Sequence, residues 1–162
     1  TYCFLYGGGN QKLGLSYDSM LPLETAKKKG AEIRRAYMDA IPGLEKLVED
    51  TKRVAGGGSI RAIDKRQILV DKEHKALNCL LQGSAAVIAK RWLLLTHKNI
   101  GETVHERYAF VHDEQVLGSP VQNAQFIADV CKLSALQAGE YYNIRLPIEA
   151  DAQIGDNWAQ VH

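Results

Sequence analysis

The segment His74–Leu95, HKALNCLLQGSAAVIAKRWLLL, constrains the fold more than any other part of the chain. Its apolar residues recur at helical spacing over about six turns, so we expect one long helix from about Lys75 to Thr96. Three side chains that form hydrogen bonds stand four residues apart and form a separate stripe along this helix. They are His74, Asn78 and Gln82.

Neutral donors in a row suit the minor groove of DNA, where every base pair offers an acceptor at a similar place. Such a stripe can therefore check base pairing without reading sequence. The residues Gly83, Ser84, Ala85 and Ala86 follow directly, and small side chains let another backbone or a ligand come close. The alternative is a solvent-facing side of the helix that happens to be neutral.

A hairpin tip is indicated by Arg107–Pro120, RYAFVHDEQVLGSP. An apolar run ends in His112, Asp113 and Glu114, and apolar character then resumes. We expect adjacent carboxylates at the end of a buried strand to repel each other and to lose hydration, which requires a compensating partner. A divalent cation such as Mg²⁺ is the usual partner, because it binds one or two carboxylates together with phosphates and water. An ordinary solvated turn is the alternative.

Composition permits a nucleic-acid role without indicating one. The 162 residues are 46% hydrophobic, and 20 basic against 19 acidic residues leave a net charge of +1. Any DNA-binding surface must therefore be local. The candidate cations are Lys27, Lys28, Lys29, Arg34 and Arg35 on one amphipathic segment, and Lys65 and Arg66 in a turn, although such runs are also typical of solvated helix faces.

The three cysteines, Cys3, Cys79 and Cys131, are widely spaced and lack any CxxC pair. This pattern predicts neither a disulfide framework nor a zinc site, and it favours a reducing cytoplasm. No apolar run approaches the roughly 20 residues that a membrane span requires, so we expect no membrane partner.

The remaining patterns predict an α+β fold. Helices are expected over residues 1–6, over Leu23–Ala40, over Pro42–Val54 with Pro42 in the first turn, and from Ser119-Pro120 to Leu136 with Ser119 as N-cap. The buried stripe of the last of these helices should be Ala124, Ile127, Val130 and Leu133. A hairpin is expected over Ile60–Val70, and Tyr141–Ile148 reads as a strand.

Four blocks in order resemble one known family. The segments FLYGGG (Phe4–Gly9), HKALNCLLQ (His74–Gln82), VHDE (Val111–Glu114) and GDNWAQVH (Gly155–His162) are similar to the C-terminal part of a family A DNA polymerase, in particular the replicative polymerases of short-tailed phages. The resemblance spans essentially the whole chain. It implies a helix-rich fingers portion over residues 1–55, followed by a palm over residues 56–162 whose antiparallel sheet packs on helices.

The resemblance assigns a role to each residue of the VHDE block. Asp113 would bind catalytic Mg²⁺, as part of a two-ion site completed by a carboxylate outside this chain. Glu114 would support that site as a second catalytic residue, and His112 would face the primer terminus. The terminal carboxylate of His162 would lie near the palm.

The other blocks imply contacts with nucleotide and DNA. Tyr2 would lie against the sugar of the incoming nucleotide and Tyr6 near the templating base, whereas ordinary core packing is the alternative for both. Cys3 departs from the small Gly or Ala that usually follows the first aromatic position. The minor-groove residues would be His74, Asn78 and Gln82, and Arg66 is a further candidate for DNA contact.

These roles together imply template-directed addition of dNTPs to a primer 3′ end during phage-type DNA replication, in the cytoplasm of a host. The expected partners are primer-template DNA, a dNTP and an N-terminal polymerase portion. That portion would hold the other metal-binding aspartate and the cations that bind the triphosphate, so we expect the isolated chain not to extend a primer. A non-catalytic DNA-binding remnant is the alternative, and the presence of both Asp113 and Glu114 argues against it.

Overall fold

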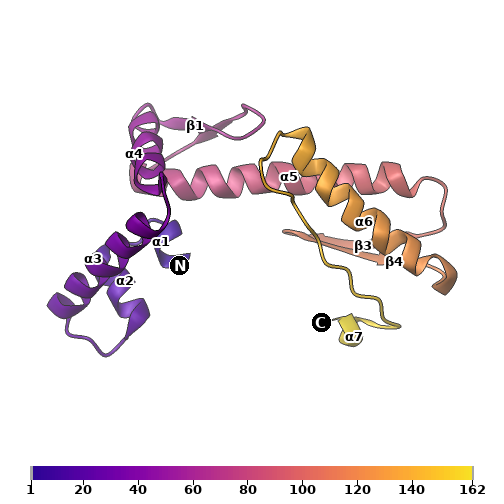
Figure 1. Cartoon of the computed structure of the whole chain (residues 1–162), viewed down its shortest axis with the longest axis horizontal. Coiled ribbons are helices and arrows are strands. Elements are labelled where there is room, and N and C mark those ends of the chain that lie inside the picture. The colour runs from indigo at the N-terminus through magenta and orange to yellow at the C-terminus, as the bar shows by residue number, and fades with distance from the viewer. Residues whose placement is uncertain (1, 162) are drawn as a thin grey trace. The chain divides into compact units, whose positions relative to one another are not determined.

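The computed structural model describes residues 2–161, so Thr1 and His162, including the expected position of the His162 carboxylate, lie outside the described residues. The chain divides into two compact units with the boundary between Gly83 and Ser84 (Figure 1). Each unit combines helices with a two-stranded antiparallel sheet. The expected α+β class is therefore confirmed, while the division into fingers and palm at residue 55 stays a prediction.

The first unit is mainly helical. Its strands β1 and β2 form a hairpin in which Ile60 pairs with Ile68, as expected from the sequence. Its elements in chain order are α1 (Tyr2–Leu5), α2 (Asn10–Tyr17), α3 (Leu23–Ala40), α4 (Leu44–Ala55), β1 (Ser59–Arg61), β2 (Gln67–Leu69), the 3-10 turn η1 (Glu73–Lys75) and the start of α5 (Ala76–Ile100).

Helices α2 and α3 pack with their backbones in contact, because glycine stands at the crossing on both sides. A Cβ atom on Gly14 would lie 1.8 Å from the carbonyl oxygen of Ala26, and one on Gly30 would lie 1.8 Å from that of Asn10. Both distances are far below van der Waals contact. Only glycine therefore allows this approach.

Two small apolar clusters stabilise the first unit. One joins Phe4 of α1 and Leu13 of α2 to Val48 of α4 and Leu77 of α5. The other packs the β1–β2 hairpin against α4 and α5, and its buried members are Ala55, Ile60, Val70 and Ala76. These clusters hold α1 and the beginning of α5 in one body.

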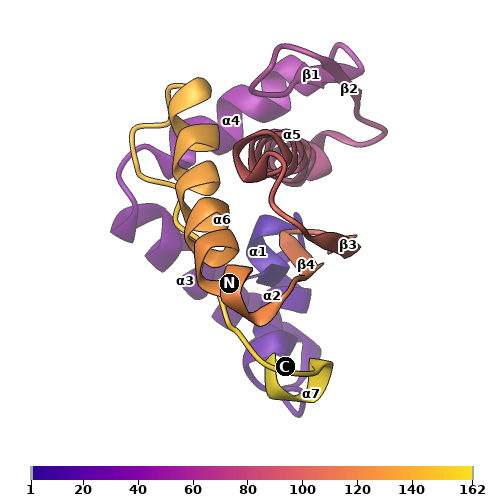
Figure 2. The same cartoon turned by 90° about the vertical axis from the view of Figure 1, so that its right-hand side faces the viewer.

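The second unit consists of the rest of α5, the strands β3 (Glu106–Val111) and β4 (Glu114–Gly118), α6 (Val121–Tyr141) and the short helix α7 (Trp158–Val161). Its core contains Ile100, Ile127 and Val130, with Leu117 of β4 packed against them. Helix α6 thus covers one face of the hairpin, and Figure 2 shows the two side by side.

Polar contacts also tie α5 to α6 and to β4 in this unit. Trp92 donates its indole N–H to the Cys131 carbonyl oxygen at 2.8 Å, and Asn99 donates to the Ser134 hydroxyl at 3.0 Å. Gln115 donates to the hydroxyl of the fully buried Thr96 at 3.1 Å. Burial in this cluster raises the pKa of the Cys131 thiol.

Several predicted elements hold, and some boundaries differ. Leu23–Ala40 is the helix expected, and α5 extends four residues beyond Thr96. Pro42 lies in a turn before α4, because left-handed Gly43 takes the N-cap position. Ser119 is likewise not an N-cap: Pro120 holds that position, and the Ser119 hydroxyl bonds to the Pro120 carbonyl oxygen instead.

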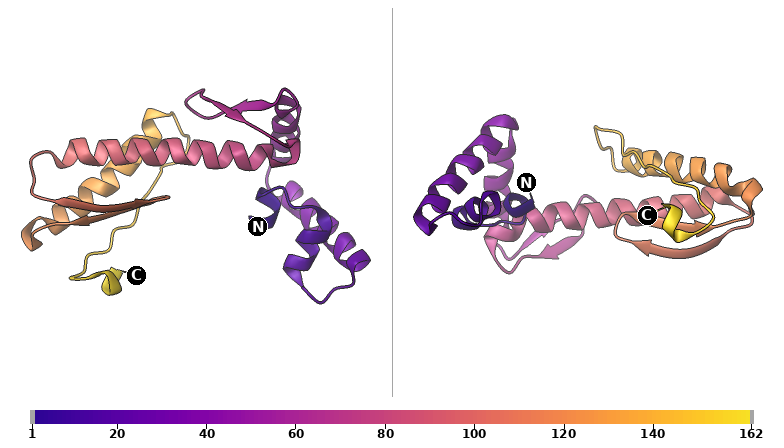
Figure 3. Two further views of the ribbon diagram at one scale, coloured as in Figure 1. Left: turned by 180° about the vertical axis from the view of Figure 1, so that it is seen from behind. Right: turned by 90° about the horizontal axis from the view of Figure 1, so that it is seen from below.

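The predicted strand over Tyr141–Ile148 is wrong. Tyr141 is the last residue of α6, and the chain then runs without a regular element to α7 (Figure 3). Within residues 2–161 the second sheet contains only β3 and β4, so the alternating Ile144, Leu146 and Ile148 have no strand to pair with. Ile148 packs against Gly139 of α6 instead.

The stripe expected on α6 is correct only in part. Ile127 and Val130 are buried, whereas Leu133 is 51% exposed and Ala124 is half-buried. The buried face continues through the small residues Ser134, Ala135 and Ala138. Ser134 accepts a hydrogen bond from the Asn99 amide of α5, so this part of the face is small and polar, which a count of large apolar residues overlooks.

We predict that Gly14→Ala destabilises the chain by roughly 1–3 kcal/mol, because the added methyl group meets backbone that cannot move aside. Urea unfolding measures the change. The control is Gly57→Ala, since a Cβ there would meet only the Val54 carbonyl oxygen at 3.5 Å, an ordinary contact. Equal stability of the two variants would contradict the close packing of α2 on α3.

Candidate functional site

Helix α1 and the residue that follows it present two tyrosines to solvent and one phenylalanine to the core. Tyr2 and Tyr6 are 77% and 51% exposed, and their ring centroids lie 6.4 Å apart. Phe4 between them is buried and stacks on Tyr37 of α3 with the ring centroids 5.4 Å apart. Within the described residues, the two tyrosines are therefore not part of the core.

The hydrogen-bonding stripe reaches α1 at Gln82. Its amide donates to the Tyr6 hydroxyl at 3.0 Å, a contact between residues 76 positions apart. Gln82 is exposed and Asn78, one turn earlier on α5, is half-buried. The structure thus brings together the exposed pair Tyr2 and Tyr6, expected at the nucleotide, and the exposed amide of Gln82, expected at the minor groove.

His74 does not belong to the long helix, contrary to the expectation of one continuous stripe. It lies in η1, immediately before α5 begins at Ala76. Its side chain is exposed, and its carbonyl oxygen would lie 2.2 Å from a Cβ on Gly7. The space beside Gly83, where we expected another backbone or a ligand to come close, is occupied by the Ile68 side chain.

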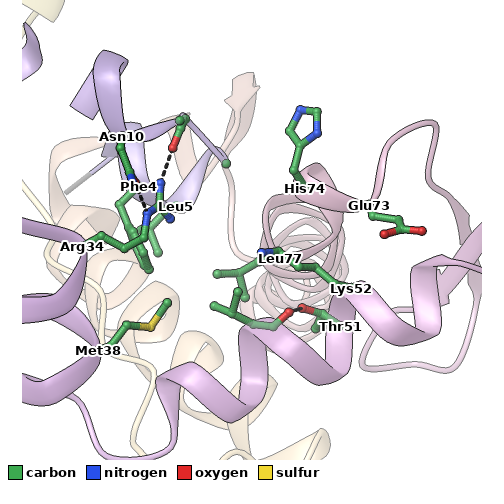
Figure 4. A pocket seen from close by; sticks show the side chains of 14 residues that line it. Phe4, Leu5, Asn10, Arg34, Met38, Thr51, Lys52, Glu73, His74 and Leu77 are labelled. Atoms are coloured by element: carbon green, nitrogen blue, oxygen red, sulfur yellow. Dashed lines mark hydrogen bonds between the residues drawn. The ribbon is translucent and has the colours of Figure 1, made fainter. Parts of the chain in front are cut away.

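The glycine turn after α1 is held by Arg34 of α3. The guanidinium donates to the carbonyl oxygen of Gly8 and, at 2.7 Å, to Oδ1 of Asn10, and it lies over the Phe4 ring. These contacts line a cavity of about 350 Å³, at whose rim His74 stands (Figure 4). The sequence offered Arg34 only as one cation in a basic run, and no motif signals its role in the turn.

Arg66 is placed in the turn of the β1–β2 hairpin, where it pairs with Asp64. Its Nε donates to an Asp64 carboxylate oxygen at 2.6 Å, and its backbone N–H donates to the other at 3.2 Å. Desolvation acts to raise the pKa of Asp64, but the bonds and charge of Arg66 outweigh it and lower this pKa. The Arg66 side chain remains 57% exposed, so its outer donors are accessible to a phosphate.

The other candidate cations are only partly available. Lys29 pairs with Glu32 at 3.1 Å and lies 5.4 Å from the centroid of the Tyr17 ring. Lys27, Lys28 and Arg35 are exposed on α3. The segment is therefore a solvated helix face with Arg34 turned toward α1.

The VHDE block forms the tip of the β3–β4 hairpin, as expected. Val111 pairs with Glu114, which leaves His112 and Asp113 as a two-residue turn. His112 adopts a left-handed backbone with φ of 54°, a conformation that disfavours residues other than glycine. Backbone strain of this kind is frequent at functional sites.

The strand that leads to this tip is not buried, which corrects the expectation of desolvated carboxylates. Val111 is 52% and Tyr108 67% exposed, because α6 covers only one face of a two-stranded sheet. Asp113 and Glu114 are exposed as well. The tip therefore offers accessible oxygen ligands, and burial of the carboxylates does not by itself require a compensating cation.

Within the described residues, no group of three or more His, Cys, Asp or Glu side chains could hold a metal ion. The donors at the tip are hard carboxylate oxygens, which fit Mg²⁺ in kind. The two carboxylates could supply part of the Mg²⁺ ligand set, and the remaining ligands would come from outside this chain. Within residues 2–161, none of the helices combines the length and apolarity that crossing a bilayer requires.

The predicted site residues fall into both units. Tyr6 and Gln82 are in direct contact, with Tyr2 beside Tyr6 in the same unit. The rest of the first unit's candidates are His74, Asn78 and Arg66, and the second unit carries His112, Asp113 and Glu114. Their functional roles stay predictions.

We predict that His112→Gly stabilises the chain by about 1 kcal/mol, because glycine adopts a left-handed backbone without the penalty that a Cβ imposes. His105→Gly is the matched control, since His105 contacts the Thr103 carbonyl oxygen at 2.8 Å through its ring and should only lose stability. Thermal unfolding measures both. A loss of stability in His112→Gly would show that the turn is unstrained.

Comparison with known proteins identifies the family. The sequence model of DNA polymerase family A matches residues 1–160. The DNA-directed DNA polymerase of Escherichia phage T7 is 28% identical over 185 aligned residues, which cover 99% of this chain and 25% of that protein. The enzyme of the same name from Escherichia phage Phieco32 is 30% identical and covers 99% of this chain and 27% of its own length.

A solved structure supports the same fold. The POL domain of Pol1 from M. smegmatis, in complex with DNA primer-template and dNTP, superimposes with a TM-score of 0.74 at 22% identity, over 91% of this chain and 27% of that one. The chain thus spans about a quarter of the length of these phage relatives. By its match over residues 1–160, the chain belongs to DNA polymerase family A.

Proposed function

We propose that this chain is part of a template-directed DNA polymerase that adds dNTPs to a primer 3′ end, in phage-type replication in a host cytoplasm. The observation that carries the proposal is the VHDE tip, where a strained His112 holds exposed Asp113 at the end of a hairpin in a family A chain. The names of the phage relatives, DNA-directed DNA polymerase, support the same reaction.

Asp113 and Glu114 are the residues that would hold Mg²⁺. Asp113 supplies an accessible oxygen ligand at the turn, and Glu114, the first residue of β4, supports the same tip. A carboxylate outside this chain would complete the set. When bound, two Mg²⁺ ions stabilise the attacking and leaving oxygens of phosphoryl transfer.

Tyr2 and Tyr6 would receive the incoming nucleotide. Tyr2 is exposed on α1 and Tyr6 directly after it, and Phe4 anchors the opposite side, so two aromatic faces are available to a sugar and a base. Tyr2 would lie against the sugar, and Tyr6 near the templating base. Their rings would exclude water on that side and orient the nucleotide for attack.

Asn78, Gln82 and His74 would contact the minor groove of the primer-template. The amide of Gln82 has a second N–H beyond the one that it donates to Tyr6, so it can bond to a base while it holds that contact. His112 would face the primer terminus, and Arg66 would bind a backbone phosphate. Phosphate contacts of that kind position DNA without reading its sequence.

We predict that Asp113→Asn, in the full-length polymerase that contains this chain, lowers turnover roughly a thousandfold while primer-template affinity changes little. The amide keeps the shape of the side chain and removes the charge that holds the metal. Glu114→Gln should be milder, because water can replace a supporting group.

Single-turnover primer extension in Mg²⁺ and in Mn²⁺, with a DNA-binding titration, measures these effects. The matched control is Glu106→Gln, an exposed carboxylate at the start of β3, which should not change turnover. Near-normal turnover of Asp113→Asn would refute the proposed reaction. Full DNA affinity without turnover in the unmodified enzyme would favour a non-catalytic DNA-binding remnant.

We further predict that Gln82→Ala and Asn78→Ala weaken extension from a mispaired primer end more than from a paired one. Each loses a neutral hydrogen bond of about 1 kcal/mol, so the ratio of the two rates should shift about fivefold. Gln125→Ala, an exposed glutamine on α6, is the control. An unchanged ratio in both variants would remove the stripe from the DNA-binding surface.

A further inference from the structure

We propose that Arg34 is a positioning residue for the incoming nucleotide, because its guanidinium fixes the glycine turn on which the tyrosine-bearing helix α1 ends. The inference rests on the proposed function in one respect: it assumes that Tyr2 and Tyr6 meet the nucleotide. Arg34 itself contacts neither tyrosine in the described contacts and acts through the turn.

Three contacts converge on the Arg34 side chain. Nε donates to Oδ1 of Asn10 at 2.7 Å, and Nη2 donates to the Gly8 carbonyl oxygen. The centre of the guanidinium lies 5.2 Å from the centroid of the Phe4 ring. Figure 4 shows Arg34 pointing from α3 toward Asn10 and Phe4, so one side chain of α3 touches the end of α1, the turn and the start of α2.

The turn needs such a contact because it consists of three glycines. Gly7 has a left-handed φ of 74°, and Gly8 donates its N–H to the Cys3 carbonyl oxygen at 2.9 Å. Glycine backbones have wide conformational freedom, so these residues alone do not fix the direction of α1. The bond from Arg34 to the Gly8 carbonyl oxygen restricts the turn further, in addition to the burial of Phe4 on α1.

The position of Arg34 is itself well defined. Gly30, one turn earlier on α3, lies against the backbone of Asn10, so α3 cannot slide along α2. Arg34 thus transmits the position of the packed α2–α3 pair to α1, and from there to the exposed rings of Tyr2 and Tyr6.

Lysine cannot replace arginine in this role. The two donors of Arg34 point to different acceptors in one plane, and the flat face of the same group covers an aromatic ring. An ammonium group is a compact point charge without that planar geometry. Arg34→Lys therefore keeps the positive charge but lacks the planar set of donors. An effect of this substitution would show that the geometry of the group matters and not its charge alone.

The first test measures nucleotide use by the full-length polymerase. Arg34→Lys should raise the KM for dNTP about tenfold, as expected for loss of a charge-assisted hydrogen bond, and should leave the primer-template Kd within about twofold. The control is Arg35→Lys, which changes the neighbouring exposed cation of α3 and should alter neither value.

The second test uses hydrogen exchange on the 162-residue chain and does not depend on activity. Arg34→Lys and Asn10→Ala should both speed exchange at the Gly8 amide about tenfold, and the double variant should be no faster than Arg34→Lys. Asn10→Asp should keep the protection, because a carboxylate accepts the same bond with added charge.

The outcomes separate failure of this inference from failure of the proposed function. An unchanged KM for dNTP in an active Arg34→Lys enzyme, or unchanged exchange at Gly8, would overturn the positioning role. A uniform loss of DNA affinity with a smaller salt dependence would overturn it too, and would make Arg34 a phosphate contact. If the unmodified polymerase did not extend a primer, the proposed function would fail. The rate of hydrogen exchange at the Gly8 amide would then be the test of the Arg34 contact.

Discussion

The backbone contact between α2 and α3 is the constraint on which the first unit depends. Gly14 and Gly30 let the two helices approach until carbonyl oxygens occupy the space where Cβ atoms would stand. This contact fixes the position of Arg34 relative to α2, and Arg34 in turn forms hydrogen bonds to Gly8 and Asn10. The orientation of the exposed Tyr2 and Tyr6 therefore depends on the packing of α2 against α3.

In the second unit, the β3–β4 tip is held in position by different contacts. Helix α6 covers one face of the β3–β4 hairpin, and buried polar bonds such as Gln115 to Thr96 hold β4 against α5. Tyr108 lies at an irregularity in the register of β3, and its ring lies over Gly118 of β4. A packed base with an accessible tip suits the proposed role of these carboxylates, in which they would bind an ion together with groups from elsewhere.

Local patterns predicted the elements whose cause is local. The helix Leu23–Ala40, both hairpins and the position of the VHDE block at a hairpin turn follow from periodicity and turn residues, whereas the exposure of that turn does not. The strand over Tyr141–Ile148 was predicted wrongly because alternation indicates a strand only where a partner strand exists, and partners are a matter of tertiary structure.

The candidate site was predictable to a similar extent. The motif blocks contain every candidate except Tyr2 and Arg66, yet the bond from Gln82 to Tyr6 joins residues far apart in sequence and carries no local signal. The sequence suggested that Arg34 is one of several DNA-binding cations, because its neighbours in sequence are exposed cations. Its partners lie instead on α1 and α2 and in the turn between them. Contacts across helices decide such roles, and spacing along one helix does not show them.

The proposed function requires the β3–β4 tip to meet the primer end. A photoreactive nucleotide at the primer 3′ terminus, cross-linked within the full-length polymerase and mapped by mass spectrometry, tests it directly. Attachment is expected at His112 or within a few residues of it, and it should be lost when the reactive group is moved ten nucleotides upstream. Attachment confined to other segments with either primer would contradict it.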